Sequence, residues 1–176
     1  MAPELMGVAG AESGVTLIEL LMVIAVVGIL LAIGVANYAR WRATSAVMQG
    51  AQEFTQAVRT TRSGAKRANA CWQISLMASS ASNTQYQVKE YSGSSCPTGT
   101  TPAPTRTRVY DMPAGTQLIR VDGAGALSTT ASVINFVPPY ATSDSVPDNF
   151  QSRWIANTSI KRDIRVTGLF GKVIVR

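Results

Sequence analysis

The stretch SGVTLIELLMVIAVVGILL (residues 13–31) opens a long apolar segment that runs from Val15 to Ala36 and carries one charged residue, Glu19. These 22 residues would form about 33 Å of helix, which is enough to cross the hydrocarbon core of a bilayer. A carboxylate at that depth costs about 2.5–3.5 kcal/mol on insertion scales. The sequence therefore predicts a membrane-spanning helix whose acidic residue needs an explanation.

A helical pattern continues beyond the apolar segment to about Lys66. Apolar or small residues recur every three or four positions, and polar residues occupy the opposite side. The apolar stripe consists of Ala43, Val47, Ala51, Phe54, Val58, Thr61 and Ala65, and the polar side carries Gln49, Gln52, Glu53, Gln56, Arg59 and Lys66. We expect one helix of roughly 75 Å, starting at Thr16. Its first half would face lipid, and its second half would lay one stripe on a globular core.

After Asn69 the pattern changes to the period of two that is typical of strands. The predicted strands are CWQISLM (71–77), YQVKEY (86–91), RTRVY (106–110), QLIRV (117–121), SVINFV (132–137), RWIANTS (153–159), IKRDIRV (160–166) and KVIVR (172–176). The last two would form a hairpin across TGLFG (167–171), in which two glycines supply turn freedom. We therefore predict an α+β fold, in which a long N-terminal helix packs on an antiparallel β-sheet domain.

Composition argues against an enzyme. The 176 residues include no histidine, so the commonest general base and metal ligand is missing. The acidic residues beyond the apolar segment are scattered without the spacing of a metal site or a catalytic pair, and two cysteines are too few for structural zinc. No glycine-rich phosphate loop follows a strand. We expect no catalytic residues, no metal site and no cofactor.

The chain is basic, with 16 Lys and Arg against 10 Asp and Glu and a formal charge of +6. Residues 1–14 carry two of the acidic residues and no basic ones, so the chain without them would have a charge of +8. Such a balance favours acidic partners such as nucleic acid or anionic lipid. Solubility alone is the simpler explanation.

The residues GVTLIEL (14–20) resemble the processing site of the type IV pilin family, which includes the pseudopilins of type II secretion. The resemblance implies that residues 1–14 are a leader and that a prepilin peptidase cuts between Gly14 and Val15. It also implies that Val15 is then N-methylated. Glu19 becomes the fifth mature residue, and its carboxylate would meet the Val15 amine of a neighbouring subunit in a filament. Pairing would offset a desolvation cost that neither charge bears well alone.

A second resemblance concerns RSGAKRANACWQISL (62–76), which is similar to the helix-to-strand junction of the GspH/FimT group of minor pilins and pseudopilins. The two resemblances imply four parts: a leader (1–14), a transmembrane and filament-core helix (15–36), its amphipathic continuation (37–68) and a β-rich head (69–176). The implied partners are other pilins or pseudopilins, prepilin peptidase, an inner-membrane assembly platform, and membrane lipid before assembly. The implied location is the bacterial inner membrane, with the head outside the cytoplasm, and then a surface or periplasmic filament.

Several functions remain open at this point. A minor pilin of a type IV pilus, used sparingly near the tip, and a type II secretion pseudopilin would share the same N-terminal segment. A membrane-anchored periplasmic adaptor outside any filament is a third. A plain signal anchor, whose Glu19 reaches the membrane surface along its stem, would need no processing at all.

The two cysteines, Cys71 and Cys96, would lie in an oxidising compartment once the head has crossed the membrane. We expect them to form a disulfide, which would constrain the unfolded chain by roughly 3 kcal/mol in the loop-entropy model. A lone buried thiol at Cys71 is the alternative.

The C-terminal hairpin is the candidate for a ligand surface. If it alternates as written, one exposed face carries Lys161, Arg165, Lys172 and Arg176. Such a cluster attracts phosphate, and GKVIVR (171–176) resembles the Gly-Arg-x-Arg stretch with which some FimT-like minor pilins hold DNA during uptake. The sequence thus indicates either a DNA-binding face or a solvated strand face.

Overall fold

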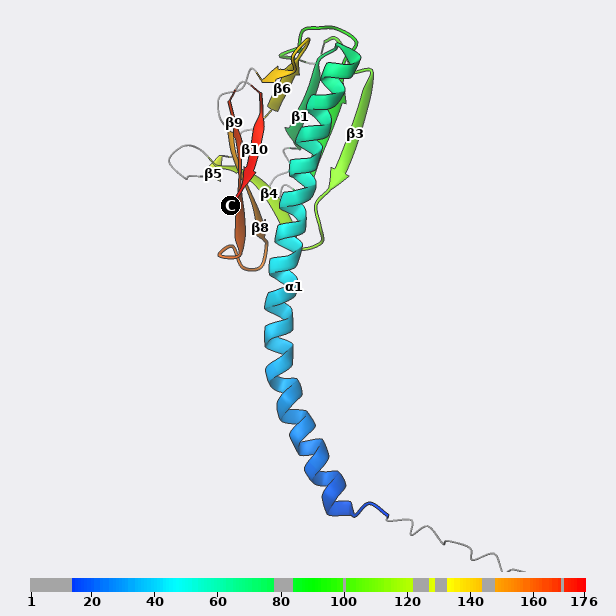
Figure 1. Ribbon diagram of the computed structural model, residues 1–176, viewed down its shortest axis with the longest axis vertical. Helices are drawn as coiled ribbons and strands as arrows, with labels where there is room; N and C mark the ends of the chain where they lie inside the picture. The colour runs from blue at the N-terminus through cyan, green and yellow to red at the C-terminus, as the bar shows by residue number, and fades with distance from the viewer. Residues whose placement is uncertain are drawn as a thin grey trace, which may run out of the picture. The chain divides into compact units, whose positions relative to one another are not determined.

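The computed structural model describes residues 14–77, 84–99, 101–121, 127–128, 133–143, 148–168 and 170–176. The chain divides into two compact units, Met1–Arg40 and Trp41–Arg176. Apart from Gly14, the expected leader lies outside the described residues. One helix, α1 (Leu17–Ala68), has 52 residues and belongs to both units (Figure 1).

Helix α1 begins one residue after the predicted start at Thr16 and ends two residues after Lys66, where the predicted helical pattern stops. At its start the Thr16 Oγ1 atom accepts a hydrogen bond from the Glu19 N–H at 3.3 Å, which is the bond of an N-cap residue. At its end Asn69 has a φ of 48°, and the Ala70 N–H donates to the Ala65 carbonyl at 3.3 Å. This left-handed ending satisfies carbonyls that the helix leaves unpaired, as an asparagine can do with little strain.

The second half of α1 buries the stripe that its periodicity predicts. All seven stripe residues are buried in the second unit, from Ala43 at 4% exposure to Ala65 at 0%. The six polar residues predicted on the other side are all exposed. This part of α1 is therefore held by tertiary packing, in addition to its own hydrogen bonds.

Within the described parts of the chain, ten strands form two five-stranded sheets in which every pairing is antiparallel. The first sheet has the order β3-β2-β1-β6-β7 and contains β1 (Trp72–Leu76), β2 (Gln85–Glu90), β3 (Arg106–Asp111), β6 (Val133–Val137) and β7 (Thr142–Ser143). The second has the order β10-β9-β8-β4-β5 and contains β4 (Thr116–Val121), β5 (Leu127–Ser128), β8 (Asp148–Trp154), β9 (Lys161–Thr167) and β10 (Lys172–Val175). The predicted α+β fold class is confirmed.

A single core joins the second half of α1 to both sheets. The Phe54 ring lies 5.3 Å from the Tyr86 ring of β2 and 5.0 Å from the Phe150 ring of β8, measured between centroids. The Ser152 hydroxyl of β8 also donates to the Val47 carbonyl of α1 at 3.0 Å. The two sheets therefore depend on the same helix for their apolar faces.

One predicted strand is wrong in its placement. The pattern RWIANTS predicted a strand over 153–159, whereas β8 covers Asp148–Trp154 and a turn follows. The Asn157 carboxamide oxygen accepts from the Ser159 N–H at 3.1 Å, and the Ile160 N–H donates to the Asn157 carbonyl at 3.1 Å. An asparagine that bonds the backbone two residues ahead favours a turn over an extended strand. The two-residue strands β5 and β7 were not predicted.

Candidate functional site

The segment around the predicted cleavage site lies just before α1. Gly14 and Val15 are exposed and precede the first helical residue, so the bond between them is outside regular secondary structure. A side chain built at Gly14 would meet nothing within 4 Å. Exposed backbone outside regular secondary structure is accessible to a peptidase.

Glu19 lies in the first turn of α1 with its side chain exposed. Negative charge is favoured at this end of a helix, because the unpaired N–H groups and the helix dipole both point toward it. Thr16 and Glu19 together organise the helix start immediately after Val15. A filament contact between the Val15 amine and Glu19 stays a prediction.

The first half of α1 exposes its apolar side chains. Leu17 and Ile18 are 78% and 77% exposed, and none of the 18-residue apolar window is buried. By length and composition, α1 is able to cross a membrane. This surface is apolar around the whole helix, which is unlike the single stripe of the second half.

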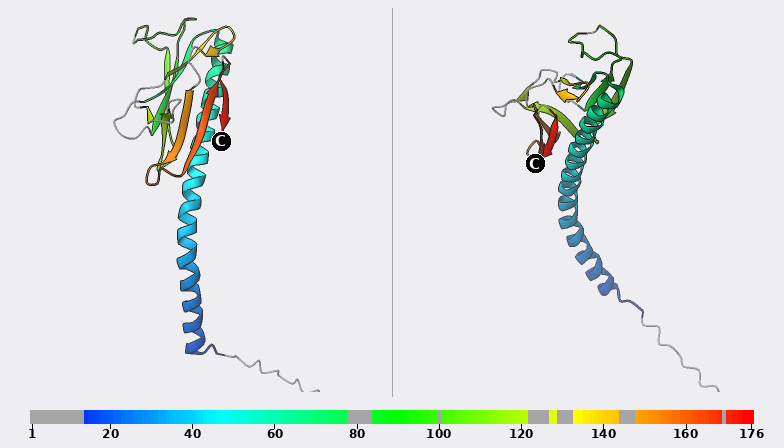
Figure 2. Two further views of the ribbon diagram at one scale, coloured as in Figure 1. Left: turned by 90° about the vertical axis from the view of Figure 1, so that its left-hand side faces the viewer. Right: turned by 45° about the horizontal axis from the view of Figure 1, so that its top comes forward.

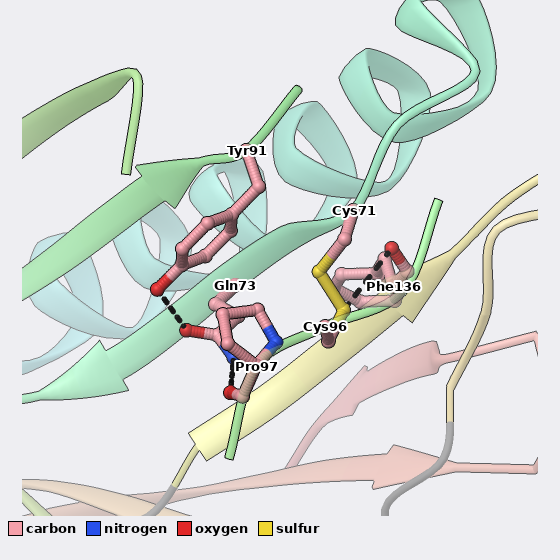
Figure 3. The surroundings of a disulfide bond; sticks show 6 residues. All are labelled: Cys71, Gln73, Tyr91, Cys96, Pro97 and Phe136. Atoms are coloured by element: carbon pink, nitrogen blue, oxygen red, sulfur yellow. Dashed lines mark hydrogen bonds between the residues drawn. A yellow bond between two sulfur atoms is a disulfide. The ribbon is translucent and has the colours of Figure 1, made fainter. Parts of the chain in front are cut away.

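Cys71 and Cys96 form a disulfide with a Cα–Cα distance of 5.2 Å. Cys71 directly precedes β1, and Cys96 lies in the loop between β2 and β3 (Figure 3). The loop is fastened further by Gln73, which donates to the Pro97 carbonyl at 3.0 Å and accepts from the Tyr91 hydroxyl at 2.9 Å. The disulfide thus holds the loop against β1, and both cysteines are used in this bond.

The basic residues of the C-terminal hairpin share one face. Register pairs Lys172 with Thr167 and Ile174 with Arg165, and the Arg176 N–H donates to the Asp163 carbonyl at 2.9 Å. Because side chains alternate along a strand, Lys161, Arg165, Lys172 and Arg176 project to the same side, and all four are exposed. Asp163 interrupts this face, and its carboxylate accepts from the Gln151 amide at 2.7 Å.

A second basic surface, which sequence reasoning missed, lies between α1 and the end of the hairpin. Arg59, Arg62 and Lys66 of α1 face Phe170 and Lys172 across a groove of about 650 Å³. Two views of the ribbon show β10 beside the second half of α1 (Figure 2). The spacing of Arg59, Arg62 and Lys66 places them on one helix face, and this can be seen in the sequence. The hairpin residues opposite them are more than 100 residues away in sequence, so the groove itself cannot be seen there.

Among the described residues, no three His, Cys, Asp or Glu side chains gather in a way that could hold a metal ion. The arrangement offers instead an apolar helix surface, a basic hairpin face and a basic groove. Each of these is suited to binding another macromolecule.

Comparison with solved structures identifies the fold. The minor pilin FimU of Pseudomonas aeruginosa superposes with a TM-score of 0.52 at 14% identity, over 74% of this chain and 87% of FimU. The chain has a type IV pilin-like fold. A second crystal form of FimU gives a TM-score of 0.49 at 13% identity, over 73% of this chain and 91% of FimU. The sequence matches no protein-family model, and no curated protein matches it.

The pilin-like fold was expected from GVTLIEL and RSGAKRANACWQISL. Within the second motif, Gly64 is buried against the Trp72 ring, which occupies the space that a Cβ atom at this position would need. The junction is therefore a close helix-to-strand contact, and a small residue is needed there.

Proposed function

We propose that this chain is a minor type IV pilin, made as a membrane prepilin and built into a filament. The observation that carries the proposal is the first half of α1: an apolar helix, exposed on all sides, in a chain with a pilin-like fold. Burying that surface in lipid holds the prepilin in the membrane, and packing between apolar helices would keep the surface away from water in a filament. The role is structural and involves no catalysis.

Glu19 sets the subunit register in this proposal. Prepilin peptidase would cut the Gly14–Val15 bond and leave an amine four residues before the Glu19 carboxylate. In the apolar interior of a filament, an unpaired carboxylate is costly, so each Glu19 would pair with the Val15 amine of the neighbouring subunit. Subunits in another register would leave both charges unpaired.

Intact mass spectrometry of the native protein tests the processing. The expected mass is that of residues 15–176 with one added methyl group and two hydrogens fewer for the disulfide. A mass that includes residues 1–14 would contradict the proposal.

Glu19→Ala tests the assembly. We expect the variant to be inserted in the membrane and cut, but to be lost from sheared filaments. Glu53→Ala is the matched control, because Glu53 is also an exposed acid on α1 but lies in the second unit, Trp41–Arg176. Normal incorporation of Glu19→Ala would contradict a register role and favour a membrane-anchored adaptor.

A type II secretion pseudopilin would give the same results in the mass measurement and in the Glu19→Ala test. Deletion of the gene distinguishes the two roles: loss of pili indicates a pilin, and loss of secretion indicates a pseudopilin.

A second candidate function is DNA binding during uptake, favoured by the four exposed cations on one face of the C-terminal hairpin, Lys161–Arg176. We would measure binding of duplex DNA to the full chain in zwitterionic detergent over a salt series. Arg165→Ala with Arg176→Ala should weaken binding and lower the salt slope by about two counterions. Arg67→Ala with Arg106→Ala, two exposed cations away from this face, is the control. Equal effects of the two double variants would remove the hypothesis.

A further inference from the structure

The groove between α1 and the β9–β10 turn has fixed walls. The turn is closed by a bond from the Gly171 N–H to the Gly168 carbonyl at 3.0 Å. Gly171 has a φ of 56°, and a Cβ atom there would lie 2.8 Å from the buried Phe136 ring of β6. This close approach holds the turn against the core. The opposite wall is the second half of α1, which the core also holds.

The groove concentrates positive charge. Arg59, Arg62 and Lys66 follow one another at steps of three and four residues on α1, so they share a helix face and span about 10 Å. Lys172 adds another cation from β10, and none of the described residues that line the groove is acidic. Like charges at this spacing repel one another, so an anion in the groove relieves an existing cost.

Arg62 is the best-placed recognition group. Its side chain is half-buried, and its guanidinium carbon lies 5.7 Å from the centre of the Phe170 ring. The ring thus holds the guanidinium by a cation–π contact. Its Nε atom is buried and finds no acceptor among the described residues. A guanidinium held against a ring at the edge of a groove is suited to the two oxygens of a carboxylate.

We propose that this basic groove binds carboxylates on an acidic segment of a different subunit, adjacent in the filament. The inference rests on the filament role proposed above. The charge of +8 expected after processing makes a second copy of this chain an unfavourable neighbour and an acidic subunit a favourable one. Acidic residues on one face of a helix, three or four apart, would match the spacing of the three cations on α1.

The groove suits a polypeptide better than a nucleic-acid strand. Grooves for single strands combine cations with several aromatic rings on which successive bases stack. Among the described residues that line this groove, Phe170 is the only aromatic one, and one face of its ring already carries Arg62. Recognition here therefore depends on charge and on the guanidinium fork, with little contribution from stacking.

The test uses the full chain in zwitterionic detergent and two fluorescent probes of equal formal charge, an oligo-glutamate peptide and oligo-dT. Fluorescence anisotropy at low salt should show tighter binding of the peptide. Arg62→Ala should weaken peptide binding about tenfold, which is the loss expected for one charge-assisted hydrogen bond. Arg59→Glu with Lys66→Glu, at exposed positions where folding is not at risk, should abolish it.

Arg67→Ala is the matched control, because Arg67 is an exposed cation on the same helix that does not line the groove. It should change peptide affinity less than about twofold, as expected for an exposed charge away from the ligand. Equal losses in Arg62→Ala and Arg67→Ala would overturn the proposal, and tighter binding of oligo-dT would assign the groove to nucleic acid. The assay measures peptide binding to the chain in detergent, before any filament is assembled, so its result does not depend on the filament role. If the chain keeps residues 1–14 but binds the peptide, the filament role is contradicted and the groove proposal is not. If the chain is processed and forms filaments but does not bind the peptide, the groove proposal is contradicted and the filament role is not.

Discussion

The two halves of α1 have the same secondary structure but different sources of stability. From Leu17 to Arg40 the described side chains are exposed, whereas from Ala43 onward one stripe is buried against both sheets. The glycines show the same contrast. Gly28 and Gly34 would accept a side chain in open space, while Gly50 and Gly64 lie against the core. The second half has its packing partner within the chain, and the first half has none among the described residues.

The largest expected effect on the free energy of unfolding comes from truncating Phe54, in the second half of α1. Truncating a fully buried aromatic residue removes its transfer free energy and leaves a cavity, so Phe54→Ala should lower the free energy of unfolding of the head by about 3–5 kcal/mol. Urea denaturation in detergent, followed by near-ultraviolet circular dichroism, measures this change. Leu20→Ala, in the exposed half, should leave the urea midpoint of the head unchanged. A similar loss in both variants would contradict the division of the helix.

Removing the disulfide should have the next largest effect. The bond closes a loop with a sequence separation of 25, and its loss should cost the head about 3 kcal/mol by the chain-entropy model. We would compare Cys71→Ser with Cys96→Ser, as a double variant, with the wild-type chain by thermal denaturation. Reducing the wild-type chain should reproduce the change. A head unaffected by either treatment would show that packing alone holds the loop.

Adding a methyl group by a glycine-to-alanine substitution should destabilise the fold in the second half of α1 and have no effect in the first half. In Gly64→Ala the new Cβ atom would meet the Trp72 ring, so the helix or the strand must shift, at a cost of about 1–3 kcal/mol. Gly28→Ala meets no atom and should leave the unfolding of the head unchanged. Thermal denaturation of both variants sharpens the comparison. Equal melting temperatures would contradict the close contact at the junction.

The smallest expected effect is a pH dependence confined to the head. Burial raises the pKa of Tyr86, and the nearby carboxylate of Glu53 and the Tyr110 hydroxyl raise it further. In the unfolded chain a tyrosine loses its proton near pH 10, while in the folded head Tyr86 keeps it. The free energy of unfolding should therefore be intact below about pH 10 and should fall as the pH rises above it. Tyr86→Phe should flatten that decline in urea midpoints, and an unchanged slope would contradict the assignment.

Local features of the chain were predictable from the sequence. The buried stripe of α1 follows from a period of three to four residues, and the hairpin of β9 and β10 follows from alternation on both sides of two glycines. The shared face of Lys161 and Lys172 follows from the same alternation. These patterns depend on neighbours within a few residues, and such neighbours can be identified without knowing the tertiary structure.

Features that depend on long-range pairing were not predictable. The division into two sheets places β6 beside β1 and β4 beside β8, and no pattern in the individual strands specifies those neighbours. The groove needs Arg62 and Phe170 in contact, which the packing of the hairpin on α1 decides. The wrong strand over 153–159 has a different cause, because a local turn at Asn157 competed with the apolar residues around it.

The position of the disulfide determines how the chain would carry a mechanical load. Tension transmitted along α1 would reach Cys71, cross directly to Cys96, and bypass the residues between them, which include β1 and β2. With the crosslink intact, this loop could not lengthen under a pull. A reduced chain would release about 80 Å of additional contour at roughly 3.3 Å per residue. The crosslink therefore shortens the extension available to a stretched chain and shields the centre of its first sheet from the applied force.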